Sequence, residues 1–168
     1  MKTLNLIRHG EAEDTFNIKN DFLRNLSING ISDLTLLDEY LLQFNFKKHK
    51  ILCSSSNRTK ETFNLLTESL NPASNIVFTS DLYLATFKSL LQIINIESTN
   101  SNMLTLIGHN PGLSDLLSYI TNDYDIQDIG TSTFISFSFS KKINDEVIEG
   151  AGKVEHFIQS KNSKIINL

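Results

Sequence analysis

The sequence predicts an α/β fold, a three-layer αβα sandwich around a mostly parallel sheet of about six strands with an antiparallel edge. Between residues 3 and 120, short apolar runs alternate with helical patterns, and this alternation favours a parallel sheet with helices on both faces. Two further strand patterns then follow with no helix between them, which indicates an antiparallel edge. The length of 168 residues suits one domain with one core, spanning residues 1–168.

The first strand is predicted at residues 3–7, a continuous apolar run of the kind that is buried on both faces of a sheet. The polar segment 11–26 has no clean period, so we expect a long loop or a partly helical cover there. Apolar side chains then recur at helical spacing over residues 31–44, and Ser27 before them is a plausible N-cap.

The next two units repeat this order of strand and helix. Residues 51–53 form a short strand, and the helix after it begins near Arg58 and is broken by Asn71-Pro72. Residues 75–79 form the third strand, and a helical stripe runs over residues 87–94.

The fourth strand is predicted at residues 103–107, and apolar side chains at helical spacing follow over residues 113–120. Pro111 suits the first position of that helix, and Asn110 suits its N-cap. Helix N-termini bind anions through their free N–H groups and the helix dipole, which makes this segment a candidate anion site.

The last third of the chain is predicted to add the antiparallel edge. Residues 133–139 alternate with period two, and residues 153–159 form the last predicted strand. The tail from Ser160 is polar and is expected to be loose, although Ile165 and Ile166 could dock on the sheet.

Composition and charge argue against several classes of protein. The net charge of −4 and a pI near 5.5 disfavour nucleic acid as the main partner. One cysteine allows no intrachain disulfide, which fits a reducing compartment. No apolar run has the length needed to span a bilayer, and residues 1–3 lead directly into the first strand, with no room for a signal peptide. We therefore expect a cytoplasmic protein without a membrane partner.

Two of the predicted strands end at a histidine. Arg8 and His9 follow the first strand, and His109 follows the fourth. Ligands of open α/β sheets bind in the crevice outside the carboxyl ends of the strands, and the planar fork of arginine suits phosphate. Arg58 lies in the first turn of a helix, where a cation opposes the helix dipole unless an anion is bound nearby.

These side chains predict one phosphate site, with Arg8, Arg58, His109 and Asn110 as its phosphate-binding residues. The sequence contains no cluster of carboxylates that would hold Mg²⁺ and no Cys/His pair that would hold Zn²⁺. We therefore expect chemistry that needs neither a metal ion nor another cofactor.

Three motifs, in this order along the chain, resemble the histidine phosphatase superfamily, whose fold is called phosphoglycerate mutase-like. They are Arg8-His9-Gly10, Arg58 and Gly108-His109-Asn110-Pro111-Gly112. Two more motifs resemble the SixA-type phosphohistidine phosphatase branch of that superfamily. They are Asp21-x-x-Arg24-x-Leu26-Ser27-x-x-Gly30 and Asp81-x-Tyr83. The matches cover residues 4–112.

The resemblance implies catalytic roles for four of these residues. His9 would be the nucleophile, phosphorylated by the substrate and then hydrolysed, and His109 would donate to the phosphoryl oxygens in the transition state. Arg8 and Arg58 would bind those oxygens, and Arg24 is a candidate substrate contact. An attacking imidazole must be unprotonated, which is realistic because an ordinary histidine titrates near pH ~6.5.

The acid that protonates the leaving group is less evident. Some branches of the superfamily carry Asp directly after the second histidine, where this chain has Asn110. Asp81 is the nearest candidate, and it could equally cap a helix or its preceding turn. An alkoxide needs a proton in order to leave, whereas the conjugate acid of imidazole has a pKa of only ~6.5. A site with arginines and no obvious acid therefore suits a phosphoramidate better than a phosphate ester.

The sequence thus predicts a phosphatase that works through a phosphohistidine intermediate and acts on phosphohistidine proteins. One alternative is a phosphatase for a small phosphate ester, and another is a non-catalytic phosphate-binding or interaction module. The sugar-phosphate mutases of the superfamily are longer, with inserted segments that close over the substrate, and this chain has little length to spare for them. A binding module needs no free nucleophile, so the intact set of histidines and arginines favours an enzyme.

Overall fold

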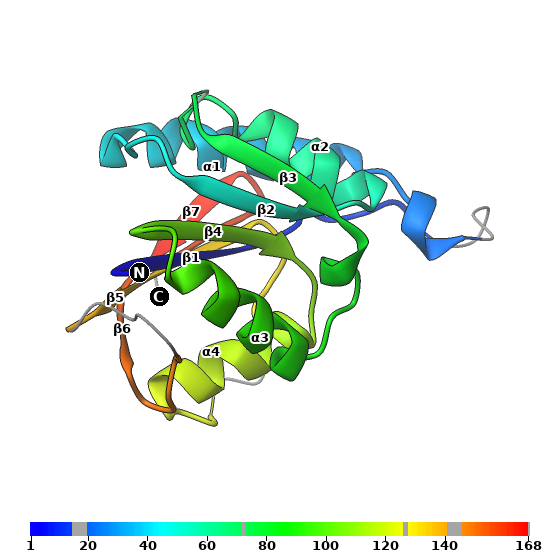
Figure 1. The fold of residues 1–168 in the computed structure, drawn as a ribbon. Helices are drawn as coiled ribbons and strands as arrows, with labels where there is room; N and C mark the ends of the chain where they lie inside the picture. Colours follow the sequence, from blue (N-terminus) through cyan, green and yellow to red (C-terminus); the bar gives the residue numbers. More distant parts are fainter. Residues whose placement is uncertain (15–19, 72, 126–127, 141–145, 168) are drawn as a thin grey trace.

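The computed structural model describes residues 1–14, 20–71, 73–125, 128–140 and 146–167. Its centre is a seven-stranded sheet with the order β3-β2-β4-β1-β5-β6-β7 (Figure 1). The parallel core consists of β1 (Thr3–Arg8), β2 (Lys50–Ser54), β3 (Asn75–Thr79) and β4 (Met103–Gly108). The antiparallel edge consists of β5 (Thr133–Phe139), β6 (Gly152–Lys161) and β7 (Lys164–Asn167).

Helices cover both faces of the sheet, as the alternation of strand and helix predicted. One face carries α1 (Ile28–Leu41) and α2 (Asn57–Leu65), and the other carries α3 (Phe87–Ser98) and α4 (Gly112–Thr121) (Figure 1). Short 3₁₀ helices in the described connections are η2 (Asp21–Leu23), η3 (Leu42–Phe44) and η4 (Ser80–Leu82). The prediction of a three-layer αβα sandwich with an antiparallel edge is confirmed.

Alternate residues of β1 pack into opposite layers, because successive side chains of a strand point to opposite faces. Leu6 belongs to the apolar cluster under α3 and α4, and Ile7 belongs to the cluster under α1 and α2. Both residues are almost fully buried, with 1% and 0% of their surface exposed. A slip of one residue would move both side chains to the wrong layer. The core therefore fixes the register of β1, and with it the positions of Arg8 at the end of the strand and of His9 directly after it.

The helix starts agree with the sequence in one case and differ by one residue in another. Ser27 is the N-cap of α1, and its side chain accepts a hydrogen bond of 3.0 Å from Gly30 N, as predicted. α4 begins at Gly112 with Pro111 as its N-cap, so the prediction of Asn110 at the N-cap and Pro111 at the first helical position was wrong. The Asn110 amide instead donates to a loop at residues 128–129.

The tail from Ser160 is ordered into β7 rather than loose, and the sheet has seven strands instead of about six. A two-residue turn at Asn162 and Ser163 connects β6 to β7, and both residues have positive φ values of 53° and 56°. That geometry is the type I′ turn favoured in β-hairpins. Ile165 packs against the α1/α2 cluster, which supplies the docking contact for the strand.

The segment between β1 and α1 is a partly helical cover in its described part. η2 and an isolated bridge between Ala12 and Leu26 give it structure, while residues 15–19 lie outside the described residues. α2 ends at Leu65, earlier than the break expected at residues 71–72, although Leu66 and Leu70 beyond it are fully buried. None of the helices that the structure describes is long and apolar enough to cross a membrane.

Candidate active site

The two strand-end histidines lie side by side because β1 and β4 are neighbours in the sheet. The register pairs Arg8 with Gly108, so His9 and His109 leave adjacent parallel strands at the same level. Their ring centroids are 5.0 Å apart, and the two residues are 9% and 3% exposed. The structure therefore brings together two imidazoles that are 100 positions apart in the sequence.

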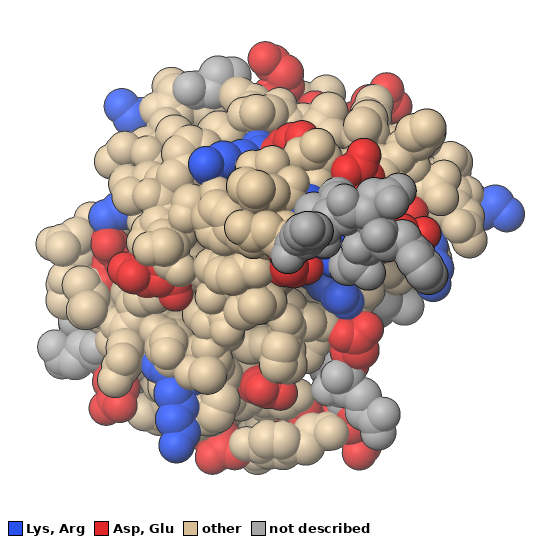
Figure 2. All heavy atoms as spheres, turned by 90° about the vertical axis from the view of Figure 1, so that its right-hand side faces the viewer, with Lys and Arg blue, Asp and Glu red and all other residues tan. Residues whose placement is uncertain are grey.

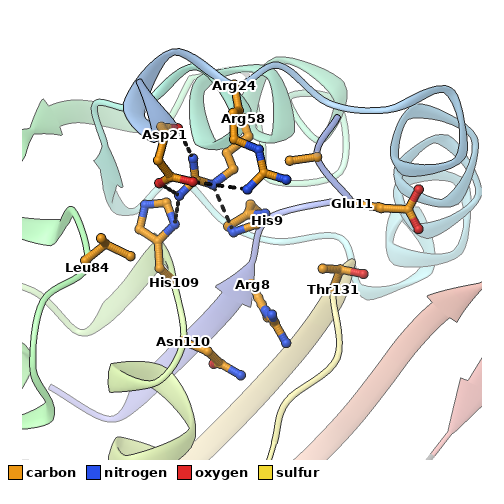
Figure 3. A pocket seen from close by; sticks show the side chains of 11 residues that line it. Arg8, His9, Glu11, Asp21, Arg24, Arg58, Leu84, His109, Asn110 and Thr131 are labelled. Carbon is orange, nitrogen blue, oxygen red and sulfur yellow. Dashed lines mark hydrogen bonds and ion pairs between the residues drawn. The ribbon is translucent and has the colours of Figure 1, made fainter. Parts of the chain in front are cut away.

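Arg58 bridges these imidazoles from the first turn of α2. Its Nε donates to His9 Nε2 at 3.2 Å, and its Nη2 lies 3.3 Å from His109 Nδ1 (Figure 3). The residue is 3% exposed. A guanidinium has only donors, so both ring nitrogens that face Arg58 must present lone pairs to it.

The backbone at Gly10 selects the tautomer of His9. His9 Nδ1 lies 2.6 Å from the carbonyl oxygen of Gly10, which can only accept a hydrogen bond, so Nδ1 carries the proton. The lone pair is then on Nε2, the nitrogen that faces Arg58. A Cβ at position 10 would lie 2.6 Å from Leu34 Cδ1 and 3.1 Å from the carbonyl oxygen of Gly30, so glycine eases the close approach of the chain to α1.

Both imidazoles are neutral at neutral pH. Burial lowers the pKa of His9 to about 3, and the charges of Arg58 and Arg8 act in the same direction against the hydrogen bond to Gly10. Burial also lowers the pKa of His109 to about 3, with His9 and Arg58 adding to the effect. Nε2 of His9 therefore carries a lone pair without any base to deprotonate it, and in this structure that lone pair accepts from Arg58 Nε.

Arg8 and Asn110 line the opposite side of the pocket and are tied to another loop. Arg8 Nη1 donates to Asp128 Oδ1 at 3.2 Å and to the carbonyl oxygen of Ile129. Asn110 Nδ2 donates to the same carboxylate and, at 3.0 Å, to the same carbonyl oxygen. In the described part of the structure, Arg8 Nε and Asn110 Oδ1 are buried without a hydrogen-bond partner, so each still has capacity for a ligand.

Asp21 is a residue of the site whose role the sequence did not predict. Its Oδ2 accepts from Arg58 Nη2 at 2.9 Å and from the Tyr83 hydroxyl at 2.7 Å. Although burial raises the pKa of this carboxyl, hydrogen bonds from Tyr83 and Arg24 and the charge of Arg58 lower it to about 2. Asp21 and Tyr83 both belong to motifs noted in the sequence, but the contact joins residues 62 positions apart.

Arg24 lies at the rim of the pocket beside Asp21. Its Nη1 donates to Asp21 Oδ1 at 3.1 Å, and its Nε donates to the carbonyl oxygen of Glu13 at 2.7 Å. The guanidinium thus faces the pocket while it is anchored to the cover segment (Figure 3). Its role as a substrate contact stays a prediction.

Asp81 does not lie in this pocket. It is an exposed residue of η4 and lines a separate hollow with Thr79 and Glu97. Thr79 is the N-cap of η4 and Thr86 is the N-cap of α3, so the alternative prediction of a helix cap at Asp81 was wrong. Because Asp81 does not line the pocket, it is not placed to protonate a leaving group bound there.

The pocket has a volume of about 450 Å³ and opens on the face to which the carboxyl ends of the parallel strands point. Figure 2 shows this face, on which basic and acidic side chains are interspersed. Its lining consists of Arg8, His9, Glu11, Ala12, Asp21, Arg24, Arg58, Leu84, His109, Asn110 and Thr131. Within the described residues, no group of three or more His, Cys, Asp or Glu side chains could hold a metal ion.

Solved structures share this fold over nearly the whole chain. A protein assigned as the phosphohistidine phosphatase SixA from Agrobacterium tumefaciens has a TM-score of 0.78 and 19% identity, covering 93% of this chain and 96% of its own. The protein histidine phosphatase SixA in complex with tungstate has a TM-score of 0.77 and 19% identity, covering 94% and 96%. A mycobacterial glucosyl-3-phosphoglycerate phosphatase has a TM-score of 0.67 and 12% identity, covering 92% and 97%.

The chain therefore has the fold of these solved phosphatase structures, which is the phosphoglycerate mutase-like fold. SixA phosphohistidine phosphatases are structural neighbours over 93–95% of the chain, so the resemblance indicated by the motifs is confirmed at the level of the fold. No protein-family model matches the sequence, and the comparison with curated proteins gives no match.

Proposed function

We propose that the protein is a phosphatase that transfers a phosphoryl group to His9 and then hydrolyses it, and that its substrates are phosphohistidine proteins. The observation that carries the proposal is the neutral His9 ring, whose Nε2 lone pair faces Arg58 beside His109. A nucleophile, an always-charged donor and a second imidazole thus meet at one point of the pocket. Phosphoryl transfer relies mostly on such positioning and on electrostatic stabilisation.

The first step forms one P–N bond and breaks another. His9 Nε2 attacks the phosphorus atom while the substrate imidazole, which carries a proton from solvent on its other ring nitrogen, departs as a neutral ring with the electron pair of its P–N bond. In the second step water attacks the phosphorus of phospho-His9, which releases inorganic phosphate and restores the neutral ring. Arg58, Arg8 and His109 stabilise the negative charge on the phosphoryl oxygens in both steps.

The charge of the pocket supports a phosphoramidate as the substrate. Asp21 is ionised at neutral pH and has no proton to give, because its pKa is lowered to about 2. Glu11 accepts hydrogen bonds from Ser27 Oγ at 2.6 Å and from Asn29, at the start of α1. Imidazole is a good leaving group without a strong acid, since it departs as a ring whose conjugate acid has a pKa of ~6.5.

A small phosphate ester is the second candidate substrate. The glucosyl-3-phosphoglycerate phosphatase has the same fold, and so does a structure from Escherichia coli assigned as an α-ribazole-5′-phosphate phosphatase. The lack of a proton-bearing carboxyl at Asp21 favours the phosphohistidine protein over the ester.

The decisive experiment compares turnover of a phosphohistidine protein with turnover of p-nitrophenyl phosphate, followed by an alkaline quench, because the P–N bond of phosphohistidine hydrolyses in acid, and by mapping of labelled phosphate. We expect a larger kcat/KM on phosphohistidine and a transient label on His9. Label on His9 with the larger kcat/KM on the ester would select the ester phosphatase. Binding of phosphate without turnover or label would instead identify a binding module and reject the proposal.

Chelation tests the source of the positive charge. Because Arg58, Arg8 and Arg24 supply three cations to the lining, EDTA should leave kcat unchanged. A loss of activity that Mg²⁺ or Zn²⁺ restores would contradict this model of the site.

A further inference from the structure

Ser54 contacts His109 from the side of the ring that faces away from the pocket. It is the last residue of β2, which pairs directly with β4, and it is 0% exposed. Its Oγ lies 2.9 Å from His109 Nε2. The other ring nitrogen, Nδ1, lies 3.3 Å from Arg58 Nη2, so the imidazole is held between a hydroxyl and a guanidinium.

A count of donors and acceptors shows that this arrangement is one acceptor short. Arg58 can only donate, so Nδ1 of His109 must accept and the ring proton must be on Nε2, which donates to Ser54 Oγ. The hydroxyl hydrogen of Ser54 then needs an acceptor of its own. His109 is the only hydrogen-bond partner of Ser54 Oγ among the described residues, so that buried hydrogen is left without one.

The opposite tautomer of His109 also lacks one hydrogen-bond acceptor, at a different atom. If Ser54 donates to His109 Nε2, the ring proton lies on Nδ1 and points at the N–H group of Arg58, so that two donors face each other. A neutral imidazole offers only these two arrangements, and His109 is neutral because burial lowers its pKa. Buried polar groups are nearly always hydrogen-bonded, so an acceptor that the protein lacks in both arrangements has to come from the pocket that His109 lines, as water or as a bound ligand.

A phosphoryl oxygen is an acceptor of the required kind, because it can receive hydrogen bonds from Arg58 Nη2 and His109 Nδ1 together. We propose that Ser54 is a positioning residue that sets the tautomer of His109, and that the resting trio of Ser54, His109 and Arg58 is completed by a phosphoryl group. On binding, the ring loses the proton on Nε2 to water and gains one on Nδ1 from water, and Ser54 turns to donate to Nε2. The inference rests on the proposed function of the pocket as a phosphoryl site.

A hydroxyl suits this position because it is both donor and acceptor and can serve either tautomer. At rest Ser54 keeps Nδ1 of His109 free to accept from Arg58, and with ligand it supports an Nδ1–H that donates into the pocket. The second imidazole therefore becomes a donor only when a phosphoryl group is present.

The direct test is ¹⁵N NMR of the histidine rings in the wild-type protein, without ligand and saturated with inorganic phosphate. We expect the His109 proton on Nε2 at rest and on Nδ1 with phosphate. His9 serves as the internal reference, because its hydrogen bond to the Gly10 carbonyl keeps its own proton on Nδ1. The same His109 tautomer in both states would overturn the inference.

The kinetic test compares Ser54→Ala with Ser56→Ala. Ser56 is also 0% exposed, and its Oγ bonds to Thr59 Oγ1 at 2.8 Å instead of a histidine, so it controls for loss of a buried hydroxyl. Ser54→Ala should lower kcat by about 10- to 100-fold, the range typical of partners that orient a functional imidazole, with KM changed little. It should also abolish the phosphate-dependent change of tautomer, whereas Ser56→Ala should keep it.

Equal kcat values for the two variants, or an unchanged tautomer response in Ser54→Ala, would reject the role of Ser54. If Ser54→Ala does not fold, the wild-type NMR measurement still decides the inference. A protein that changes tautomer with phosphate but turns over no substrate would reject the proposed function and leave the role of Ser54 intact.

Discussion

Arg58 and Arg8 both line the pocket, but the structure holds their guanidinium groups in different ways. Arg58 is 3% exposed, contacts both imidazoles, and is fixed from behind by the carboxylate and the carbonyl of Asp21. Arg8 is paired with Asp128, whose side chain is 67% exposed, and keeps a buried Nε without a partner in the described structure. We call the two parts of the pocket around these residues the Arg58 side and the Arg8 side. The Arg58 side is therefore held in place before a substrate binds, whereas on the Arg8 side the Nε–H group can still donate to a ligand.

The difference follows from the carboxylates that hold each arginine. Asp21 accepts from two arginines and a tyrosine, so several bonds must break together before Arg58 can move. An exposed pair such as Arg8 and Asp128 contributes only about 0.2–1 kcal/mol, so Arg8 can exchange its partner for a phosphoryl oxygen at small cost. We expect chemistry to depend mainly on the Arg58 side and phosphate affinity to be tuned from the Arg8 side.

The largest effect on turnover should come from substitution of His9, the residue between the two sides. His9→Ala removes the proposed nucleophile while the apolar clusters of the core stay unchanged, so turnover should fall by more than about 100-fold, or over ~2.7 kcal/mol, with the fold intact. His156→Ala is the control, because that histidine is exposed and lies on β6. Steady-state kinetics and circular dichroism give the answer, and a smaller loss would contradict a covalent role for His9.

The next effect distinguishes the two arginines directly. Lysine keeps the charge but not the planar fork, so Arg58→Lys cannot contact both imidazoles and an anion together. We expect a loss in kcat of about 10²–10³-fold, comparable to removal of a donor to transition-state charge. Arg8→Lys should lose only about tenfold, or ~1.4 kcal/mol. Equal losses in the two variants would break the comparison.

The sequence was sufficient for the three residues at the centre of this comparison. His9 and His109 end neighbouring parallel strands, and Arg58 begins the helix after a third, so local patterns and the topology of the sheet place them together. Asp21 and Asp128 were beyond such reasoning, because they hold arginines 37 and 120 positions away in the chain. No local period records a pairing of that kind.

The fold was predictable to a similar extent, and its errors have local causes. The strand β7 was missed because a polar tail hides its pairing, although Asn162 in a two-residue turn was a usable sign of a hairpin. The start of α4 was misplaced by one residue because Asn110 and Pro111 both suit a helix start, and the contact of Asn110 with residues 128–129 decides between them. Tertiary contacts overrode local preference in both cases.

The two carboxylates should respond in opposite directions. Asp21→Asn weakens the hold on Arg58, and we expect kcat to fall by about tenfold, or ~1.4 kcal/mol. Asp128→Asn releases Arg8 for the ligand, so inorganic phosphate should inhibit up to about fivefold more tightly, the equivalent of ~1 kcal/mol from an exposed pair. Inhibition constants and kcat on one substrate measure both. A fall in kcat for Asp128→Asn with no gain in phosphate affinity would reverse the assignment of the two sides.

The smallest effect near neutral pH is the contribution of the two imidazoles to the stability of the fold, and it becomes measurable as the protein is acidified. The pKa values of His9 and His109 are lowered to about 3, while an unfolded histidine titrates near pH ~6.5. Between those values the unfolded chain binds protons that the native protein does not, so stability is fully present above pH ~6.5 and falls as the pH drops toward 3. The thermal midpoint should therefore decline across this window. In His9→Ala one of the two contributions is absent, so its midpoint should decline less steeply than that of the wild type. Parallel declines in both proteins would show that the pKa of His9 is not lowered in the folded state, which would contradict the buried, neutral ring on which the site model depends.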